Sequence, residues 1–375
     1  MYKDISVVFP YAESYDSHYG GAIARWVFEV TSRTTEKLNF TVYSASKFNN
    51  YGKSECSLYG KYCNFIKGIE REYTASKYMD VFVYQLKRFT CRDTIWILSI
   101  YSKIKKSDCI VIHNRPKVPR LLRALGYKGK IILHMHNSHL YHLNNKTAFL
   151  LKNSVDLILY CSNFLKAETL EKFPYLESKS EVIYNGVEDF KQPQKIKNKI
   201  ILFAGRIIES KGVIELIRAF NIVKKNHKEY SLHLVGGVTS GESKQKTQYL
   251  VDLEQEISSS SFREDIKFIG YLDHGKLIEE MRNSEVLSVA SKWKEPFGMV
   301  ALEGFTCGCK VVATSNGGMP EILGNFGYYC ECEPNSIAQA IEEAILDAEY
   351  SFNKKHYERF LWSNISSDFE SILLQ

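Results

Sequence analysis

The chain has 375 residues, of which 45% are hydrophobic and nine are cysteine, and its formal net charge is +6. This length suits two domains of about 180 residues, each with enough apolar residues for its own core. It contains no apolar run of about 18 residues, which excludes a transmembrane helix. The strand-like segment 5–9 follows the first residues without a secretory apolar stretch. With its scattered cysteines, we therefore expect a cytoplasmic protein.

Short apolar, β-branched segments alternate with helical patterns along the whole chain. The strands predicted in the first half are 5–10, 40–44, 109–113, 130–134, 157–161 and 181–184. Those predicted in the second half are 200–204, 231–235, 266–269, 286–290 and 310–313, with an amphipathic helix over 212–225. This alternation predicts an α/β fold, in which helices cover both faces of parallel sheets.

A polar, lysine-rich stretch at 188–199 interrupts the alternation and is interpreted as a linker. It separates a first unit at 1–187 from a second unit that begins at residue 188. We therefore expect two Rossmann-like units that face each other across a cleft. Ligands of open α/β sheets bind at the carboxyl ends of the strands, so the cleft suits a nucleotide-type ligand. Such a fold does not by itself name a reaction.

The strongest motif lies in the stretch 294–304. Glu295 precedes a proline, which forces extended backbone and places the helix start after it. Amides of the first turn, from Gly298 through Met299 to Val300, would then attract phosphate or sugar hydroxyls. Glu303 follows eight residues after Glu295, so each carboxylate could bind a diol. The alternative is an ordinary capped helix with a surface glutamate.

A second motif follows the apolar strand that ends at Gly205. Arg206 and Lys211 emerge on the loop before the next helix. Two cations at a strand end and a helix start can bind a diphosphate without a metal ion. The alternative is that both are simply solvated. The sequence has no DxD pair, a common metal-binding signature, so we expect neither a metal nor another cofactor.

Two weaker signals lie in the first half. Gly20 and Gly21 follow the first strand, where paired glycines let backbone approach a ligand. His136 follows the strand over 130–134 and is interpreted as a polar contact or proton carrier, with a buried structural histidine as the alternative.

Four histidines and two cysteine pairs are the candidates for metal binding. It is disfavoured for His134, His136, His139 and His142 because no carboxylate or cysteine is spaced to complete a shell. The cysteine pairs at 307–309 and 330–332 have one-residue spacers, whereas zinc sites more often have two. Ordinary core cysteines are the preferred interpretation.

In their order along the chain, these motifs resemble glycosyltransferase family 4. The resemblance rests on the glycine pair, His136, the stretches 184–187 and 205–212, the pair Glu295 and Glu303, and the stretch 317–321. It implies the two-domain GT-B fold, whose last segment, here 354–375, returns to the first domain, so the second domain would span 188–353. The stretches 111–114 and 133–137 look closest to lipopolysaccharide-core N-acetylglucosaminyltransferases.

The resemblance also implies roles for the matching positions. Arg206 and Lys211 would neutralise the diphosphate of a UDP-sugar donor, and Glu303 would hold its ribose. Glu295 would hold the donor sugar together with the amides near Phe297 and Gly298. The remaining implied donor contacts are Gly21, Asn185, His136 beside the transferred sugar, and Tyr271 near the base. The implied reaction is metal-independent transfer with retention, and a soluble acceptor or binding without turnover are the alternatives.

Charge is unevenly distributed between the halves. Residues 1–187 contain 27 Lys or Arg and 16 Asp or Glu, whereas residues 188–375 contain 22 and 27. The surplus lies around Lys103, Lys105 and Lys106 and over 115–130. These basic residues can simply be solvated on helix faces, or they can bind an anionic membrane surface or an anionic acceptor. Binding to nucleic acid is less favoured because the sequence has no nucleic-acid recognition motif. We expect a lipid-linked or other glycan acceptor, at the inner face of the cell membrane.

Overall fold

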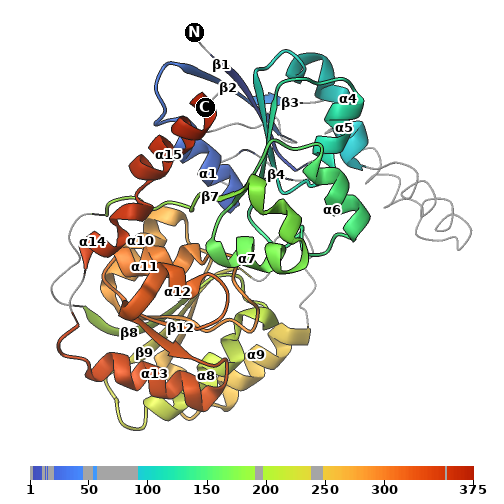
Figure 1. Ribbon diagram of the computed structural model, residues 1–375. Coiled ribbons are helices and arrows are strands. Elements are labelled where there is room, and N and C mark those ends of the chain that lie inside the picture. Colours follow the sequence, from blue (N-terminus) through green and yellow to red (C-terminus); the bar gives the residue numbers. More distant parts are fainter. Residues whose placement is uncertain are drawn as a thin grey trace, which may run out of the picture. The chain divides into compact units, whose positions relative to one another are not determined.

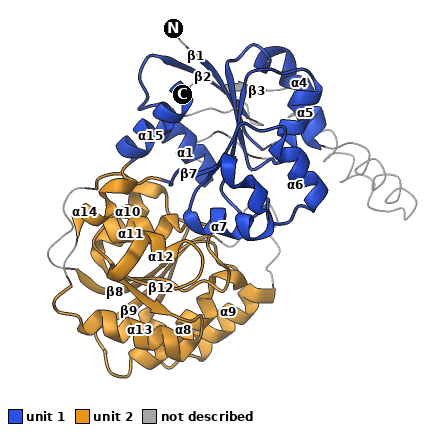
Figure 2. Ribbon diagram, in the orientation of Figure 1, with its two compact units in different colours: residues 1–185, 362–375 blue, residues 186–361 orange. Residues whose placement is uncertain are grey.

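The computed structural model describes residues 3–10, 13, 15, 21–44, 54–56, 92–190, 197–237, 248–350 and 353–375. Gly20 lies outside these residues. Within them the chain forms two compact units, residues 1–185 with 362–375 and residues 186–361, which Figure 2 shows in different colours. No helix among the described residues is long and apolar enough to cross a membrane.

The first unit is built on a parallel sheet with the strand order β3-β2-β1-β4-β5-β6-β7. Its strands are β1 (Lys3–Val8), β2 (Leu38–Ser44), β3 (Ser54–Cys56), β4 (Cys109–His113), β5 (Lys130–Met135), β6 (Leu157–Tyr160) and β7 (Ser180–Val182). Every residue of β4 is buried, as expected of a central strand covered on both faces. The order reverses at β1, which pairs with both β2 and β4.

Helices flank this sheet, as Figure 1 shows. They are α1 (Ala22–Thr31), α4 (Arg92–Ile104), α5 (Val118–Ala124), α6 (Asn145–Lys152), α7 (Asn163–Lys172) and the C-terminal α15 (Trp362–Leu374). The last helix packs on α1: the Ser366 hydroxyl donates to the Val30 carbonyl at 2.8 Å, and the Phe369 and Trp26 rings lie 5.0 Å apart. The C-terminus therefore belongs to the first unit.

The second unit has a parallel sheet of order β10-β9-β8-β11-β12-β13. Its strands are β8 (Asn198–Ala204), β9 (Ser231–Val235), β10 (Ile266–Gly270), β11 (Ser284–Val289), β12 (Lys310–Thr314) and β13 (Gly327–Cys330). Its helices are α8 (Val213–Val223), α9 (Gln248–Ser259), α10 (His274–Asn283), α11 (Met299–Thr306), α12 (Met319–Leu323), α13 (Pro334–Leu346) and α14 (Lys354–Tyr357). Two parallel sheets with flanking helices confirm the predicted α/β class of two Rossmann-like units.

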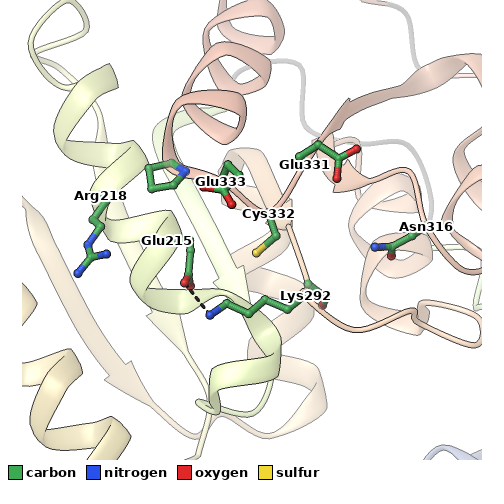
Figure 3. A pocket seen from close by; sticks show the side chains of 9 residues that line it. Glu215, Arg218, Lys292, Asn316, Glu331, Cys332 and Glu333 are labelled. Atoms are coloured by element: carbon green, nitrogen blue, oxygen red, sulfur yellow. Dashed lines mark ion pairs between the residues drawn. The ribbon is translucent and has the colours of Figure 1, made fainter.

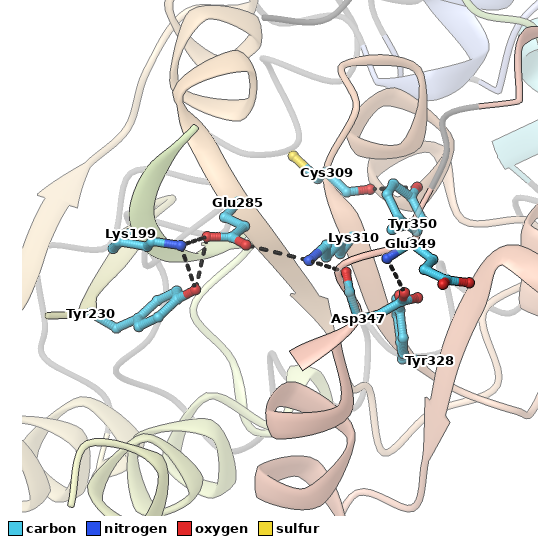
Figure 4. Close-up of polar contacts among 9 residues, drawn as sticks. All are labelled: Lys199, Tyr230, Glu285, Cys309, Lys310, Tyr328, Asp347, Glu349 and Tyr350. Carbon is cyan, nitrogen blue, oxygen red and sulfur yellow. Dashed lines mark hydrogen bonds and ion pairs between the residues drawn. The ribbon is translucent and has the colours of Figure 1, made fainter. Parts of the chain in front are cut away.

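The strand order reverses again between β8 and β11, which lie side by side. In such sheets the crevice beyond the carboxyl ends of the two strands is the usual ligand site. The amino ends are closed by a polar network, drawn in Figure 4. There Glu285 accepts from Lys199 at 2.9 Å and from the Tyr230 hydroxyl at 2.8 Å, and Lys310 lies 3.4 Å away. This end of the sheet is therefore structural.

The boundaries between the units differ from the expected ones. The first division falls after Asn185 instead of residue 187, and the chain returns to the first unit at Trp362 instead of residue 354. Residues 354–361 stay with the second unit because Lys354 and Tyr357 both bind Asp189, and Val187 pairs with Leu361. The Val187–Leu361 bridge and the two contacts with Asp189 thus hold residues 354–361 on the second unit, before α15 begins.

Candidate functional site

In the second unit, the predicted cationic residues lie on the loop that leaves β8. The Ile207 amide donates to the Gly237 carbonyl at 3.0 Å, which fixes this loop against the end of β9. Arg206, between β8 and that anchor, is exposed, and no described residue forms an ion pair or hydrogen bond with its side chain. An exposed guanidinium beyond the end of a central strand is free to bind an anion.

Lys211 has a partner, which the sequence did not predict. Its ammonium forms an ion pair and hydrogen bond with Glu295 Oε1, on the loop after β11. The same oxygen accepts from the Ser291 hydroxyl at 2.8 Å. Glu295 is 8% exposed, so its charge is largely removed from water and depends on these two partners. The structure therefore brings two of the predicted site residues into direct contact.

Three glycines shape the backbone around Glu295 and the start of α11. Gly317 has φ +73°, and a Cβ there would lie 2.3 Å from the Glu295 carbonyl oxygen. The neighbouring Gly318 amide donates to that carbonyl at 2.8 Å. Gly298 has φ +111° and caps α11, which begins at Met299. The predicted helix start is thus present, with Met299 and Val300 half-buried and Phe297 buried against Phe360 at 6.0 Å between ring centroids.

Glu303 lies one turn further along α11 and is 4% exposed. Its Oε1 is 2.9 Å from Nε2 of His274, the first residue of α10. Sequence reasoning missed His274, although it follows the end of β10 as other candidates follow their strands. At the same edge, the Gly236 amide donates to the Gly270 carbonyl at 2.8 Å, and Tyr271 is 74% exposed. The buried Glu303 carboxylate, which contacts the exposed His274 ring, is therefore available near the predicted base site.

A pocket of about 390 Å³ opens at the carboxyl end of the same sheet (Figure 3). It lies beside Ser291, the partner of Glu295, and Lys292 crosses it to pair with Glu215 at 2.8 Å. The residues that line it are Glu215, Arg218, Ser291, Lys292, Asn316, Glu331, Cys332, Glu333 and Pro334. None of the predicted donor contacts is among them.

In the first unit, His136 follows β5 and belongs to a group of three histidines. Its Nε2 is 3.0 Å from Nδ1 of His113, and its ring centroid is 4.0 Å from that of His134. Burial lowers the pKa of His136 to about 3, and an interaction with the Asn185 side chain opposes this in part. Burial also lowers the pKa values of His113 and His134. All three rings are therefore neutral at pH 7.

Ring nitrogens of these three histidines lie within 4.8 Å of one another and could hold a metal ion. The group differs from the one weighed in the sequence, because it includes His113 and leaves out His139 and His142. His139 instead contacts the Asn114 carbonyl, at 3.3 Å. Gly21 lies on another element, as the exposed N-cap of α1.

The part of the chain that carries the site contacts of the second unit matches the model of a known protein family. Residues 187–360, which hold the Lys211–Glu295 pair and Glu303, match the family model of glycosyl transferases group 1. The protein is a glycosyltransferase. The glycosyltransferase is 25% identical to the lipopolysaccharide 1,2-N-acetylglucosaminetransferase of Salmonella typhimurium, over 93% of this chain and 92% of that protein.

Solved structures bear on its fold. HepE of Anabaena, in a complex with UDP and glucose, superposes with a TM-score of 0.72 at 17% identity, over 99% of both chains. Sucrose-phosphate synthase of Thermosynechococcus elongatus has a TM-score of 0.71 at 16% identity, over 100% of this chain and 99% of that chain. The glycosyltransferase therefore has the predicted GT-B fold and resembles enzymes of lipopolysaccharide-core assembly.

Proposed function

We propose that this glycosyltransferase moves a sugar from a UDP-sugar donor onto a glycan acceptor, with retention of configuration and without a metal ion. The observation that carries the proposal is the arrangement of Arg206, Lys211, Glu295 and Glu303 at the carboxyl edge of one sheet. The UDP and glucose in the related HepE structure support this choice of donor. Glu303 would then hold the ribose diol, and Glu295 would hold the donor sugar.

Breaking the glycosyl–phosphate bond leaves negative charge on the diphosphate, and fixed cations that face this charge stabilise the transition state. Arg206 is available for this role, and Lys211 would share its charge between Glu295 and the diphosphate. In a retaining transfer the acceptor hydroxyl attacks from the face that the phosphate leaves, and the leaving phosphate takes its proton. His136 is neutral and has a pKa of about 3, so it suits a hydrogen bond to the sugar better than base catalysis.

Donor screening by thermal shift tests the first half of the proposal. A nucleotide sugar at about 100 times its dissociation constant stabilises the folded protein by roughly 2.7 kcal/mol. We expect UDP-N-acetylglucosamine or another UDP-hexose to raise the melting temperature more than the corresponding GDP and ADP sugars. Slow release of UDP from that donor without acceptor would exclude the alternative of binding without turnover. Stabilisation by a GDP-sugar alone would contradict the proposed donor.

For the acceptor, we propose lipopolysaccharide core or a related surface glycan. The support is the relative from Salmonella, which matches 93% of this chain. A soluble acceptor is the alternative, as in the glycogen synthase of Mycobacterium tuberculosis, which matches 57% of this chain. Transfer of labelled sugar to core oligosaccharides, compared with transfer to maltodextrins and to fructose 6-phosphate, separates the two.

We further propose that the basic first unit docks on an anionic membrane. Lys103, Lys105 and Lys106 are exposed at and beyond the end of α4. Each basic residue near an anionic surface contributes about 1 kcal/mol, an attraction that salt weakens. We expect co-sedimentation with anionic but not zwitterionic vesicles, and less of it when these lysines become glutamine. The matched control changes the exposed Lys225, Lys228 and Lys267 of the second unit. Equal losses in both triple variants would contradict docking through the first unit.

A further inference from the structure

Two imidazoles share a hydrogen bond at the carboxyl ends of β4 and β5. His113 ends β4 and pairs in register with His134 of β5, and His136 follows the last residue of β5. His113 Nδ1 and His136 Nε2 are 3.0 Å apart, and the two rings are stacked with an interplanar angle of 24°. His113 is fully buried. The pair is therefore held by the sheet register as well as by its own bond.

The backbone around His136 is fixed by a neighbour of His113. The His136 amide donates to the Asn114 side-chain oxygen at 2.8 Å, and the Asn114 amide donates to the His134 carbonyl at 2.9 Å. Asn114 has φ +54°, a left-handed conformation that asparagine tolerates better than most residues. These bonds set the position of the His136 ring, which leaves its protonation pattern to be decided by His113.

A neutral pair can share its proton in only two ways. Either His113 donates from Nδ1 and His136 carries its own hydrogen on Nδ1, or His136 donates from Nε2 and His113 keeps a hydrogen on Nε2. Among the described residues, His113 Nε2 and His136 Nδ1 are both buried without a hydrogen-bond partner. Each pattern leaves one buried N–H without a hydrogen bond to a described residue: the first on His136 Nδ1, and the second on His113 Nε2.

The neighbour of His136 favours the first pattern. Asn185 interacts with His136 and raises its pKa, the effect of an oxygen that accepts from the ring. Asn185 Oδ1 is itself buried without a hydrogen bond in the described part of the chain. The first pattern therefore places the unpaired hydrogen on the histidine that interacts with Asn185, whose Oδ1 lacks a donor among the described residues.

A metal ion explains the cluster less well. The ligands of a tetrahedral site with bonds of about 2.0–2.1 Å lie roughly 3.3 Å apart, whereas the His113 and His136 nitrogens are 3.0 Å apart. The His134 ring lies against both His136, at 4.0 Å, and Trp26, at 4.4 Å. The described residues that shift the pKa values of these rings are histidines and Asn185, with no carboxylate among them to balance a dication.

We propose that His113 is a positioning residue for His136: it donates from Nδ1 to His136 Nε2 and so fixes His136 as the tautomer with its hydrogen on Nδ1. His136 then carries a neutral N–H on Nδ1, an atom that is buried in the free protein. This inference rests on the proposed function for its consequence, a hydrogen bond from His136 to the transferred sugar once the donor is bound. The tautomer itself is a property of the free protein and does not depend on the proposed function.

Ring-nitrogen NMR of the full chain labelled with ¹⁵N-histidine tests the tautomer directly. The signals of His136 are assigned by their loss in His136→Gln. We expect a protonated Nδ1 and an unprotonated Nε2 in the wild type. His113→Asn keeps an amide donor near the position of Nδ1 and should preserve this pattern, whereas His113→Leu should change it. A wild-type His136 that is protonated on Nε2 would overturn the proposal.

Turnover then tests the consequence. We expect kcat to fall about five- to tenfold in His113→Leu, the effect of one neutral hydrogen bond, and to recover in His113→Asn, with UDP affinity unchanged in both. Equal losses in the two variants would overturn the positioning role. Full turnover in His136→Gln would instead reject the proposed function of His136 and leave the NMR result standing. One equivalent of bound metal in the purified protein would also overturn the proposal.

Discussion

Replacing Lys211 with alanine should destabilise the protein as well as slow it, whereas replacing Arg206 should only slow it. Lys211 is the ion-pair partner of Glu295, and the side chains of the pair are 19% and 11% exposed. Removal of one partner of a fully buried pair costs about 3–5 kcal/mol. Because this pair is partly solvated and Ser291 still donates to Glu295, we expect a loss of about 2 kcal/mol in the free energy of unfolding. For the exposed Arg206 we expect a change within about 0.5 kcal/mol.

Urea unfolding and donor-dependent UDP release measure the two effects separately. Both single variants should lose roughly 100-fold in kcat, as expected when one group that stabilises the leaving charge is removed. The double variant Lys211→Ala with Glu295→Gln removes the unpaired charge. It should therefore recover about 1 kcal/mol of stability relative to Lys211→Ala and remain inactive. Equal unfolding free energies for the Lys211 and Arg206 single variants would refute this reasoning.

Three further predictions concern the nucleotide, metal and pH. Glu303→Gln should weaken UDP binding about tenfold in calorimetry, because the ribose loses charge-assisted hydrogen bonds, whereas Glu295→Gln should act mainly on turnover; equal effects on UDP affinity would contradict this division. Turnover should survive EDTA, and a loss restored by magnesium or manganese would contradict the metal-free proposal. Burial lowers the pKa of His136 to about 3, so its contribution to stability is complete above pH 6.5 and is lost as the pH falls toward 3. At pH 5 this loss is about 2 kcal/mol, and urea unfolding should show a smaller acid loss in His136→Gln than in the wild type.

Much of the fold could be predicted because buried parallel strands appear as short apolar runs. The segment 109–113 is β4 as predicted, and 310–313 is all but the last residue of β12. The strand β13 was missed: it has four residues with Gly and Tyr, and only its last residue is buried. Its pairing with β12 makes it a strand, and a tertiary partner of this kind leaves little pattern in the sequence.

The motifs around the site could be predicted, but their contacts could not. Lys211 and Glu295 are 84 residues apart, and they meet only because β8 lies beside β11. His113 and His136 meet through the register of β4 with β5. Each residue lay at a recognisable strand end, so the sequence indicated the edge of the sheet. Which side chains share a proton or a charge depends on strand order and register, and a single sequence does not contain these explicitly.

The candidate site of the second unit contains charged side chains, whereas the buried histidines of the first unit are neutral, and this difference limits the possible mechanism. In the second unit, Arg206 is exposed, and Lys211 compensates the buried carboxylate of Glu295. In the first unit, burial keeps the histidine rings neutral. Charge that develops on a leaving diphosphate can therefore be stabilised in the second unit, whereas His136 can offer only a hydrogen bond. The pKa of His136 lies roughly four units below pH 7, so protonating its ring at pH 7 costs about 5 kcal/mol. His136 is therefore a poor base for the acceptor hydroxyl. In the proposed retaining transfer, the leaving phosphate would therefore take the proton of that hydroxyl.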